Sequence, residues 1–291
     1  MRDQADGEWA DGGGVEGGVM AQGQGRHTAN KIAAIEAFLT QNISVVRRAI
    51  GSSHYFHFDL NAGCGINELA GCIGSPLAFR AAALKAGMPE AWCFCCEVDF
   101  GAARQLQART QEDRHTFVTI GRNQDFVEQI PDIIRECGAD PRSAFGSILI
   151  DPNDHRRDAI PYDGLRLLAD QCPKIDVLFH FPQLAMKRIV AGVAKGTCPE
   201  SAADDCFDID ELPQVIGKRH LWIKQTPDLG NFAIVVGRNT DNVNEDKRTG
   251  LARWDSECGL WYRERCKLKV DDADRRHQER LDSASGQRRL W

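Results

Sequence analysis

Asp59-Leu60-Asn61-Ala62-Gly63-Cys64-Gly65 closes an apolar run, residues 54–60, that predicts a buried strand. Its two glycines let the backbone turn tightly and let a ligand approach without a Cβ in the way. In doubly wound α/β proteins, ligands lie where strands end and the strand order switches. The segment therefore predicts a ligand-binding turn, and a plain strand-to-helix turn is the alternative.

Segments of strand and helix character alternate downstream of this turn. The predicted strands are 54–60, 91–97, 116–120, 146–151 and 175–181, and the predicted helices are 75–86, 100–109, 125–137, 163–171, 182–194 and 208–216. Two further strands, 220–225 and 231–237, form a hairpin whose turn contains Pro227, Asp228 and Gly230. Apolar strands separated by helices predict an α/β, Rossmann-like doubly wound fold with a mostly parallel sheet and a C-terminal antiparallel hairpin.

The chain divides into three parts. Residues 1–26 are rich in Gly, Asp, Glu and Gln, so we expect disorder there. Residues 27–240 form one domain, which begins with an amphipathic helix over 29–50 whose apolar positions are Ile32, Ile35, Phe38 and Leu39. Residues 241–291 supply a peripheral helix, with Trp254, Trp261 and Tyr262 as anchors, and a charged tail.

Composition excludes several classes of protein. No apolar run of about 18 residues occurs and the N-terminus has no signal-peptide pattern, so we expect no membrane association. The 11 cysteines are scattered, which favours a reducing cytoplasm. Cys93, Cys95 and Cys96 alternate between the faces of a strand, so we expect no metal. A net charge of −6 argues against a protein that coats nucleic acid.

Polar residues follow three more of the predicted strands. Glu97 is suited to accept hydrogen bonds from sugar hydroxyls, or it caps the next helix. Residues 121–125 would meet a base edge, or Asn123 or Asp125 is an ordinary N-cap. Asp151-Pro152-Asn153 follows the buried run GSILI, where a substrate would meet a cofactor, or it forms a turn.

This order of motifs resembles the class I S-adenosylmethionine-dependent methyltransferases over roughly residues 50 to 240. The resemblance implies a seven-stranded sheet whose last strand is antiparallel. It implies that the glycine turn holds the methionine part of the cofactor through Asp59, Asn61, Ala62, Gly63 and Gly65. It also implies that Glu97 binds the ribose, that Asn123 and Asp125 meet the adenine, and that Asp151, Pro152 and Asn153 are catalytic and face the methyl acceptor.

A narrower set of motifs resembles the three-Cys-motif partner proteins. The segments concerned are DLNAGCG, Gly74-Ser75-Pro76-Leu77, CEVD, IDPN and the closing strand pair around Trp222 and residues 236–239. This resemblance implies a setting near bacterial mobile elements and a protein partner encoded nearby.

The acceptor loop departs from well-known nucleic-acid methyltransferases. Amino-methyltransferases carry a DPPY-like motif, but here Asp151-Pro152-Asn153-Asp154 has no aromatic residue. Cytosine-C5 enzymes need a Pro-Cys nucleophile, and no Pro-Cys dipeptide occurs. A DNA or RNA base is the acceptor that the resemblance favours, with Arg156, Arg157, Lys187 and Arg188 as a lip for phosphates or simply as a solvated surface.

For the mechanism we expect Asp151 to orient or deprotonate the acceptor, with Asn153 assisting. His180 and Lys187 are minor candidates for the acceptor side, and His180 is alternatively a satisfied strand-end histidine. Two other functions stay open. A nicotinamide-dependent oxidoreductase would need a third glycine where Glu68 stands. A non-catalytic binding or regulatory protein would keep the fold without the chemistry.

Overall fold

An eight-stranded sheet forms the centre of the protein in a computed structural model. The structure describes residues 27–51, 54–68, 70–152, 160–199, 201–204, 206–224, 232–240 and 250–267. The strands are β1 (Phe56–Asp59), β4 (Trp92–Glu97), β5 (Thr116–Ile120), β6 (Gly146–Ile150), β7 (Ile175–Phe181), β8 (His220–Lys224), β9 (Ala233–Arg238) and β10 (Ala252–Arg253). Their order is β10-β8-β9-β7-β6-β1-β4-β5.

The first five of these strands are parallel, and the antiparallel β9 lies between β7 and β8. The chain runs outward from β1 to β5 and then crosses back to β6 on the other side of β1. The strand order therefore switches beside β1, which is the place where open α/β sheets bind ligands.

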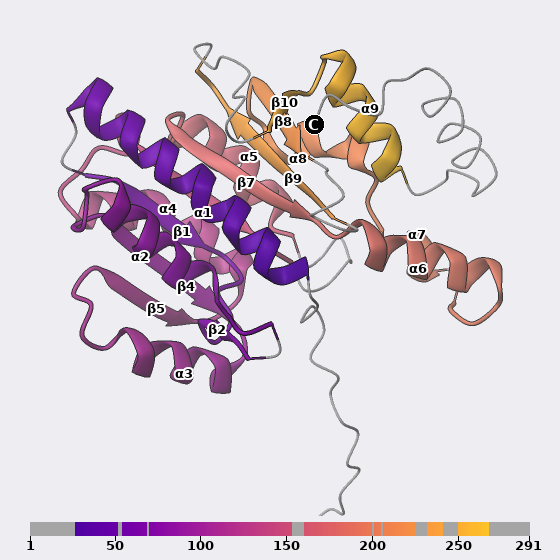
Figure 1. Ribbon diagram of the computed structural model, residues 1–291, viewed down its shortest axis with the longest axis horizontal. Helices are drawn as coiled ribbons and strands as arrows, with labels where there is room; N and C mark the ends of the chain where they lie inside the picture. Colours follow the sequence, from indigo (N-terminus) through magenta and orange to yellow (C-terminus); the bar gives the residue numbers. More distant parts are fainter. Residues whose placement is uncertain are drawn as a thin grey trace, which may run out of the picture.

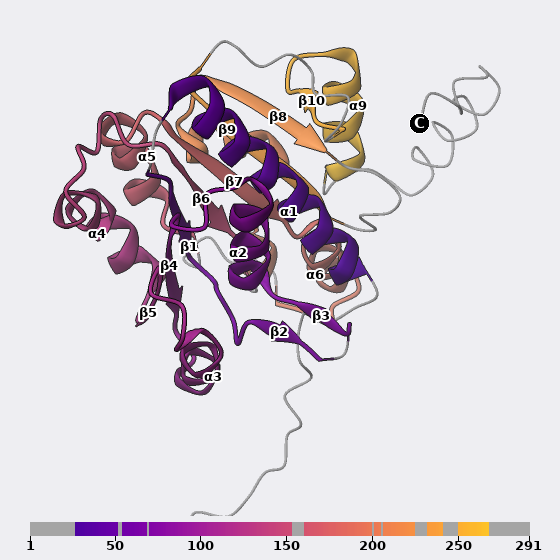
Figure 2. The ribbon, with the colours of Figure 1, turned by 60° about the vertical axis from the view of Figure 1, so that its left-hand side comes forward.

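Helices cover both faces of the sheet. The helices are α1 (His27–Val45), α2 (Ser75–Lys85), α3 (Phe100–Thr110), α4 (Asn123–Glu136), α5 (Tyr162–Gln171), α6 (Gln183–Ala194), α7 (Ser201–Asp204), α8 (Leu212–Ile216) and α9 (Glu257–Cys266). Figures 1 and 2 show α1 beside α2 on one face, hereafter the α1–α2 face, with α4 and α5 on the other.

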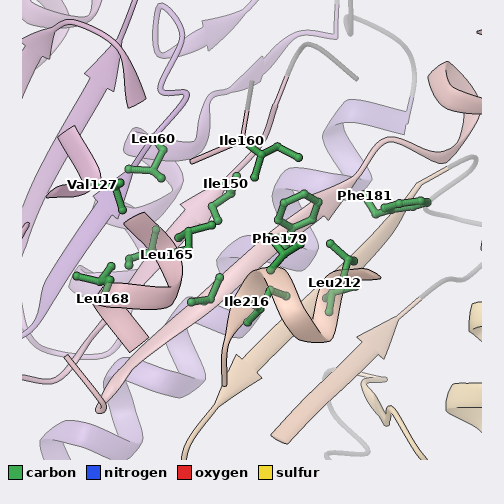
Figure 3. Close-up of a cluster of buried hydrophobic side chains, with 14 of the residues drawn as sticks. Leu60, Val127, Ile150, Ile160, Leu165, Leu168, Phe179, Phe181, Leu212 and Ile216 are labelled. Atoms are coloured by element: carbon green, nitrogen blue, oxygen red, sulfur yellow. The ribbon is translucent and has the colours of Figure 1, made fainter. Parts of the chain in front are cut away.

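Side chains alternate between the two faces of the sheet along each strand, so the protein has one hydrophobic core on each face. Phe56 and Phe58 in β1 point toward α4 and α5, whereas His57 and Asp59 point to the α1–α2 face. Figure 3 shows the first core, where Ile150 and Phe179 of the sheet meet residues of α5 and α8. The second core packs Ile35 and Leu39 of α1, among others, against α2 and the sheet.

The structure confirms the predicted fold class, and most predicted elements match to within two residues. Differences occur where elements are short. A two-residue strand, β10, makes the sheet eight-stranded rather than seven-stranded, and a small hairpin of β2 (Ile66–Asn67) and β3 (Cys72–Ile73) separates the glycine turn from α2. These strands are too short to produce an alternating pattern in the sequence.

Two predicted helices are divided. The helix expected over 208–216 is a 3₁₀ turn, Ile209–Glu211, followed by α8, because Asp208 and Glu211 form a capping box that starts the turn. The helix expected over 29–50 is α1 followed by a π-helical turn, Val46–Ile50, that ends at Gly51 with φ +66°. The predicted disorder over 1–26, the turn at Pro227, Asp228 and Gly230, and the charged tail from residue 268 lie outside the described residues.

A row of polar side chains crosses the α1–α2 face near the strand starts. His57 Nδ1 lies 2.8 Å from Ser147 Oγ, and Arg238 Nε lies 2.7 Å from Asp176 Oδ2. Strand register places these four residues side by side in β1, β6, β7 and β9. Asn42 of α1 donates to Asp176 at 2.5 Å, so the row attaches α1 to the sheet. In the described residues, no helix has the length and apolar character needed to span a membrane.

Candidate active site

Four charged or polar side chains gather at the carboxyl end of the sheet. Asp59 ends β1 and pairs with Cys95 in β4 and Leu149 in β6. Glu97 and Asp151 each lie two residues beyond those partners, and His180 lies two residues beyond Leu178, which pairs with Leu149. Because strand side chains alternate with a period of two, all four belong to the α1–α2 face. The sheet thus brings together residues that are up to 121 positions apart in the sequence.

The glycine turn and Glu97 are in direct contact. The backbone N–H of Gly63 donates to Glu97 Oε2 at 2.7 Å, and that of Asp99 donates to Oε1 at 2.9 Å. Glu97 is buried, so it is not a surface carboxylate. Asp99 is the residue that caps α3, through a bond from Ala102 N–H, so Glu97 does not serve as the helix cap.

The two glycines of the turn have different surroundings. Both have positive φ, +62° at Gly63 and +83° at Gly65, which favours glycine. A Cβ on Gly65 would lie 2.8 Å from Leu106 Cδ1, so packing requires that glycine. A Cβ on Gly63 would meet nothing within 4 Å. Open space above Gly63 leaves its backbone accessible to a ligand.

Acceptor atoms without donors line the start of this turn. Asp59 is fully buried, and its Oδ1 accepts from Asn61 N–H at 3.2 Å. Asp59 Oδ2 and Asn61 Oδ1 are buried with no hydrogen-bond partner in the structure. Burial raises the pKa of Asp59 to about 7, against the effect of Ser75 and the Asn61 amide. A buried acceptor without a donor costs about 1–3 kcal/mol, which a ligand's donor groups would offset.

The loop after β5 lies against the other side of Glu97. Gly121 N–H donates to the Glu97 carbonyl at 3.1 Å, and α4 begins at Asn123. The N-cap of α4 is Arg122, without a side-chain cap bond, so neither Asn123 nor Asp125 is the cap. Asn123 is half-buried and Asp125 is exposed.

Exposed apolar side chains flank this end of β4 and β5. Val98 follows Glu97 and is 70% exposed, and Ile120, which pairs with Glu97 in the sheet, is 40% exposed. Large exposed apolar side chains beside buried polar groups are typical of ligand sites. Together with the loop at 121–125 they offer an apolar wall with polar atoms at its edge.

Asp151 is held between two basic side chains. Lys31 Nζ of α1 lies 2.6 Å from its Oδ2, and His180 Nδ1 of β7 lies 2.5 Å from its Oδ1, at an angle outside that of a good hydrogen bond. Burial opposes ionisation of Asp151, but Lys31 and His180 outweigh it, so its pKa lies below the ordinary value. Asp151 is therefore a carboxylate at neutral pH.

Lys31 is the site residue that sequence reasoning missed. It belongs to the helix that precedes the alternating strands and helices, and no motif marks it. His180 was only a minor candidate, and the structure places it beside Asp151. Lys187, predicted for the acceptor side, instead donates to the carbonyl of Arg265 in α9 at 2.9 Å, because α6 packs near the C-terminal helix.

Part of the predicted acceptor loop cannot be compared. Pro152 is buried directly after Asp151, but Asn153, Asp154, Arg156 and Arg157 lie outside the described residues. Cys93 and Cys95 face the second core, and Cys96 faces the first. Across the described ranges, no three His, Cys, Asp or Glu residues gather as metal ligands would.

The sequence matches no family model and no curated protein. Its structure is similar to a putative methyltransferase from Thermobifida fusca, at 11% identity and a TM-score of 0.43, over 72% of this chain and 81% of that one. It is also similar to a DUF574 family protein from Streptomyces avermitilis, at 10% identity and a TM-score of 0.43, over 72% and 83% of the two chains. An rRNA methylase from Streptococcus thermophilus has 10% identity and a TM-score of 0.39, over 70% and 94%.

Proposed function

We propose that this protein is an S-adenosylmethionine-dependent methyltransferase. The observation that carries the proposal is the contact between Gly63 and Glu97, with open space above the glycine. This contact places a turn whose backbone a ligand can approach next to a carboxylate. That carboxylate can accept hydrogen bonds from sugar hydroxyls. A nucleoside bound across this contact would reach the loop at 121–125 with its base.

The charge of the site favours this cofactor among nucleosides. Asp59, Glu97 and Asp151 bring three carboxyl groups to one end of the sheet, and Asp59 Oδ2 and Asn61 Oδ1 need donors. S-adenosylmethionine offers ribose hydroxyls, an ammonium group and a positive sulfonium, all of which acidic acceptors attract. When bound, it supplies a methyl group on a positively charged sulfur, and the protein supplies orientation and electrostatics.

Each part of the cofactor has a proposed place. Asp59, Asn61, Ala62, Gly63 and Gly65 would hold the methionine part, with Glu97 on the ribose and Asn123 and Asp125 near the adenine. Asp151 and Pro152 would face the methyl acceptor, with Asn153 in the same loop. The exposed side chain of Val98 would lie against the adenine ring, because it follows the ribose ligand directly.

A nicotinamide cofactor fits these residues less well. Its pyrophosphate needs a helix N-terminus directly after the glycine turn. Here the β2–β3 hairpin follows Gly65, and α2 begins only at Ser75. The Glu97 carboxylate would also repel a phosphate placed against it. A nucleic-acid acceptor and a partner protein encoded nearby remain predictions that rest on the sequence resemblance alone.

Isothermal titration of the purified chain with S-adenosylmethionine, S-adenosylhomocysteine and NAD tests this proposal. We expect micromolar binding of the first two and none of NAD. Binding of NAD alone would overturn it. Transfer of a labelled methyl group to DNA, RNA or protein would then separate an active enzyme from a protein that binds the cofactor without using it.

A further inference from the structure

Both carboxylate oxygens of Asp151 face basic side chains. Its Oδ2 contacts Lys31 and its Oδ1 contacts His180, at 2.6 Å and 2.5 Å. The three side chains are 11–14% exposed, so water screens these contacts little. A carboxylate that must accept from the amino group of a base needs an oxygen facing that group. Asp151 instead acts on its two neighbours.

His180 places a ring nitrogen beside the Asp151 carboxylate. Both ring nitrogens of His180 are buried without a well-formed hydrogen bond, and Nδ1 lies 2.5 Å from Asp151 Oδ1. A negatively charged oxygen at that distance favours a proton on Nδ1 over a lone pair. This leaves Nε2 as the basic atom, and Nε2 is buried with no hydrogen-bond partner in the structure. An unpaired buried acceptor is costly unless a donor arrives, and a substrate hydroxyl is such a donor.

The surroundings keep the ring neutral and in place. Burial lowers the pKa of His180, and Lys31 lowers it further, against the effect of Asp151. Among the described residues, the titratable groups that bear on His180 are Asp151, directly after β6, and Lys31 of α1. Phe232, just before β9, packs its ring edge-on against the imidazole at 4.7 Å between centroids. The ring is therefore clamped between a charged pair and an aromatic side chain.

We propose that His180 is the general base of the methyl transfer and that the acceptor is a hydroxyl group, with Asp151 and Lys31 as positioning residues. This inference rests on the proposed function and adds the acceptor chemistry to it. The hydroxyl oxygen forms a bond to the methyl carbon as the sulfur–carbon bond breaks. The electron pair of that bond stays on sulfur, and the hydroxyl proton goes to His180 Nε2. The products are a methyl ether, S-adenosylhomocysteine and an imidazolium paired with Asp151.

A hydroxyl acceptor explains the arrangement better than an amino group. A neutral amine already carries the lone pair that attacks, and it needs only acceptors to orient its protons. A hydroxyl at neutral pH is a weak nucleophile until a base takes its proton. A neutral, buried imidazole held by a carboxylate serves that second need.

The first test is independent of the substrate. The full chain, labelled with ¹⁵N at its 8 histidines, is examined by NMR, with His180 assigned through the His180→Gln variant. We expect an unprotonated Nε2 at pH 7 and a proton on Nδ1. Asp151→Asn should disturb that preference. A proton on Nε2 at pH 7 would overturn the role of His180 whatever the cofactor proves to be.

The second test reads the acceptor chemistry. The protein is given methyl-labelled S-adenosylmethionine with catechol, a ribose oligonucleotide or a deoxyadenosine oligonucleotide, and the labelled atom is identified. We expect label on oxygen, with kcat at least 100-fold lower in His180→Gln and a cofactor Kd within threefold. His115→Gln, outside the site, is the matched control. Label on an adenine amine would overturn the inference but leave the methyltransferase proposal intact.

The role of Lys31 is tested by a measurement that would not change if Lys31 only stabilised the fold. Because Lys31 lowers the pKa of His180, Lys31→Met should shift the lower limb of the kcat/KM profile to higher pH. An unmoved limb would remove Lys31 from the mechanism. Failure of the wild-type chain to bind S-adenosylmethionine would overturn the proposed function itself, and the titration described above detects that separately.

Discussion

Gly63 donates its backbone N–H to Glu97 Oε2 at 2.7 Å, and this contact joins the ends of β1 and β4 across 34 residues of sequence. The same carboxylate accepts from Asp99 N–H, so two backbone groups fix its orientation. Each carboxylate oxygen has two lone pairs, so each can accept one more hydrogen bond.

Glu97→Gln replaces one acceptor oxygen of this carboxylate with an amide NH₂. We expect affinity for S-adenosylmethionine to fall 10- to 100-fold, or about 1.4–3 kcal/mol, because a charged hydrogen bond is lost. Titration calorimetry measures the change, and Glu136→Gln, on the exposed side of α4, is the control. Equal affinities for wild type and Glu97→Gln would remove Glu97 from the binding site.

Gly63→Ala and Gly65→Ala should separate binding from stability. Gly63→Ala adds a Cβ in open space, so it should cost only about 1–2 kcal/mol of backbone strain while weakening cofactor binding. Gly65→Ala has similar strain and also forces its Cβ against Leu106, which adds about 1–3 kcal/mol. Urea unfolding and calorimetry on both variants make the comparison. A greater stability loss for Gly63→Ala would contradict the packing described for the turn.

Asp59 should make stability fall as pH rises. Its pKa is raised from 3.8 to about 7 by burial, so the folded state keeps a proton that the unfolded chain has lost between those values. Stability therefore decreases across that window, and Asp59→Asn should remove the decrease. Denaturant unfolding at a series of pH values from 4 to 8 measures it.

Cofactor binding should change the protonation of Asp59. A positive ligand beside Asp59 favours its ionised form, so binding at pH 6 should release a proton. Calorimetry in buffers of different ionisation enthalpy counts that proton, and Asp59→Asn should abolish the release. The same release in Asp59→Asn would assign the proton to another group.

Lys31→Met should destabilise the fold through Asp151. The pair is largely buried, so an unpaired carboxylate costs about 2–4 kcal/mol at pH 7, reduced because His180 can take up a proton. Since Lys31 holds the pKa of Asp151 below its ordinary value, the penalty should shrink as the pH falls into the acid range.

Lys85→Met provides the comparison for that experiment. Lys85 pairs with Glu36 on the surface and is 63% exposed, so its loss should cost less than about 1 kcal/mol. Thermal and urea unfolding of both variants at pH 7 give the difference. Similar losses of unfolding free energy in the two variants would show that the buried contact with Asp151 stabilises the fold no more than a surface ion pair does.

Sequence reasoning could predict the elements that the hydrophobic period encodes. The strands that carry Asp59, Glu97 and Asp151 are each four to six residues long and almost wholly buried, so their apolar runs stand out. Their carboxyl ends could be predicted as a site because parallel strands share one edge. The contact between Gly63 and Glu97 lies at that edge.

What sequence reasoning missed depends on packing between distant segments. Lys31 reaches Asp151 only because α1 lies on the face that carries the strand ends, and no local pattern reports where a helix packs. The role of His180 likewise depends on strand register, since Asp151 and His180 come together only when β6 and β7 are aligned. The β2–β3 hairpin was missed because its strands are two residues each.

The polar row described for the fold and the separate contact with Asp151 attach α1 to the sheet at two places. Asn42 binds Asp176 near the strand starts, and Lys31 binds Asp151 beyond the strand ends, roughly 16 Å away along the helix. An α-helix of that length is stiff, so α1 rigidly links its contact near the strand starts to its contact beyond the strand ends. Loosening the attachment at Asn42, for example with Asn42→Ala, would let the Lys31 ammonium group move away from Asp151 without altering either of those two residues.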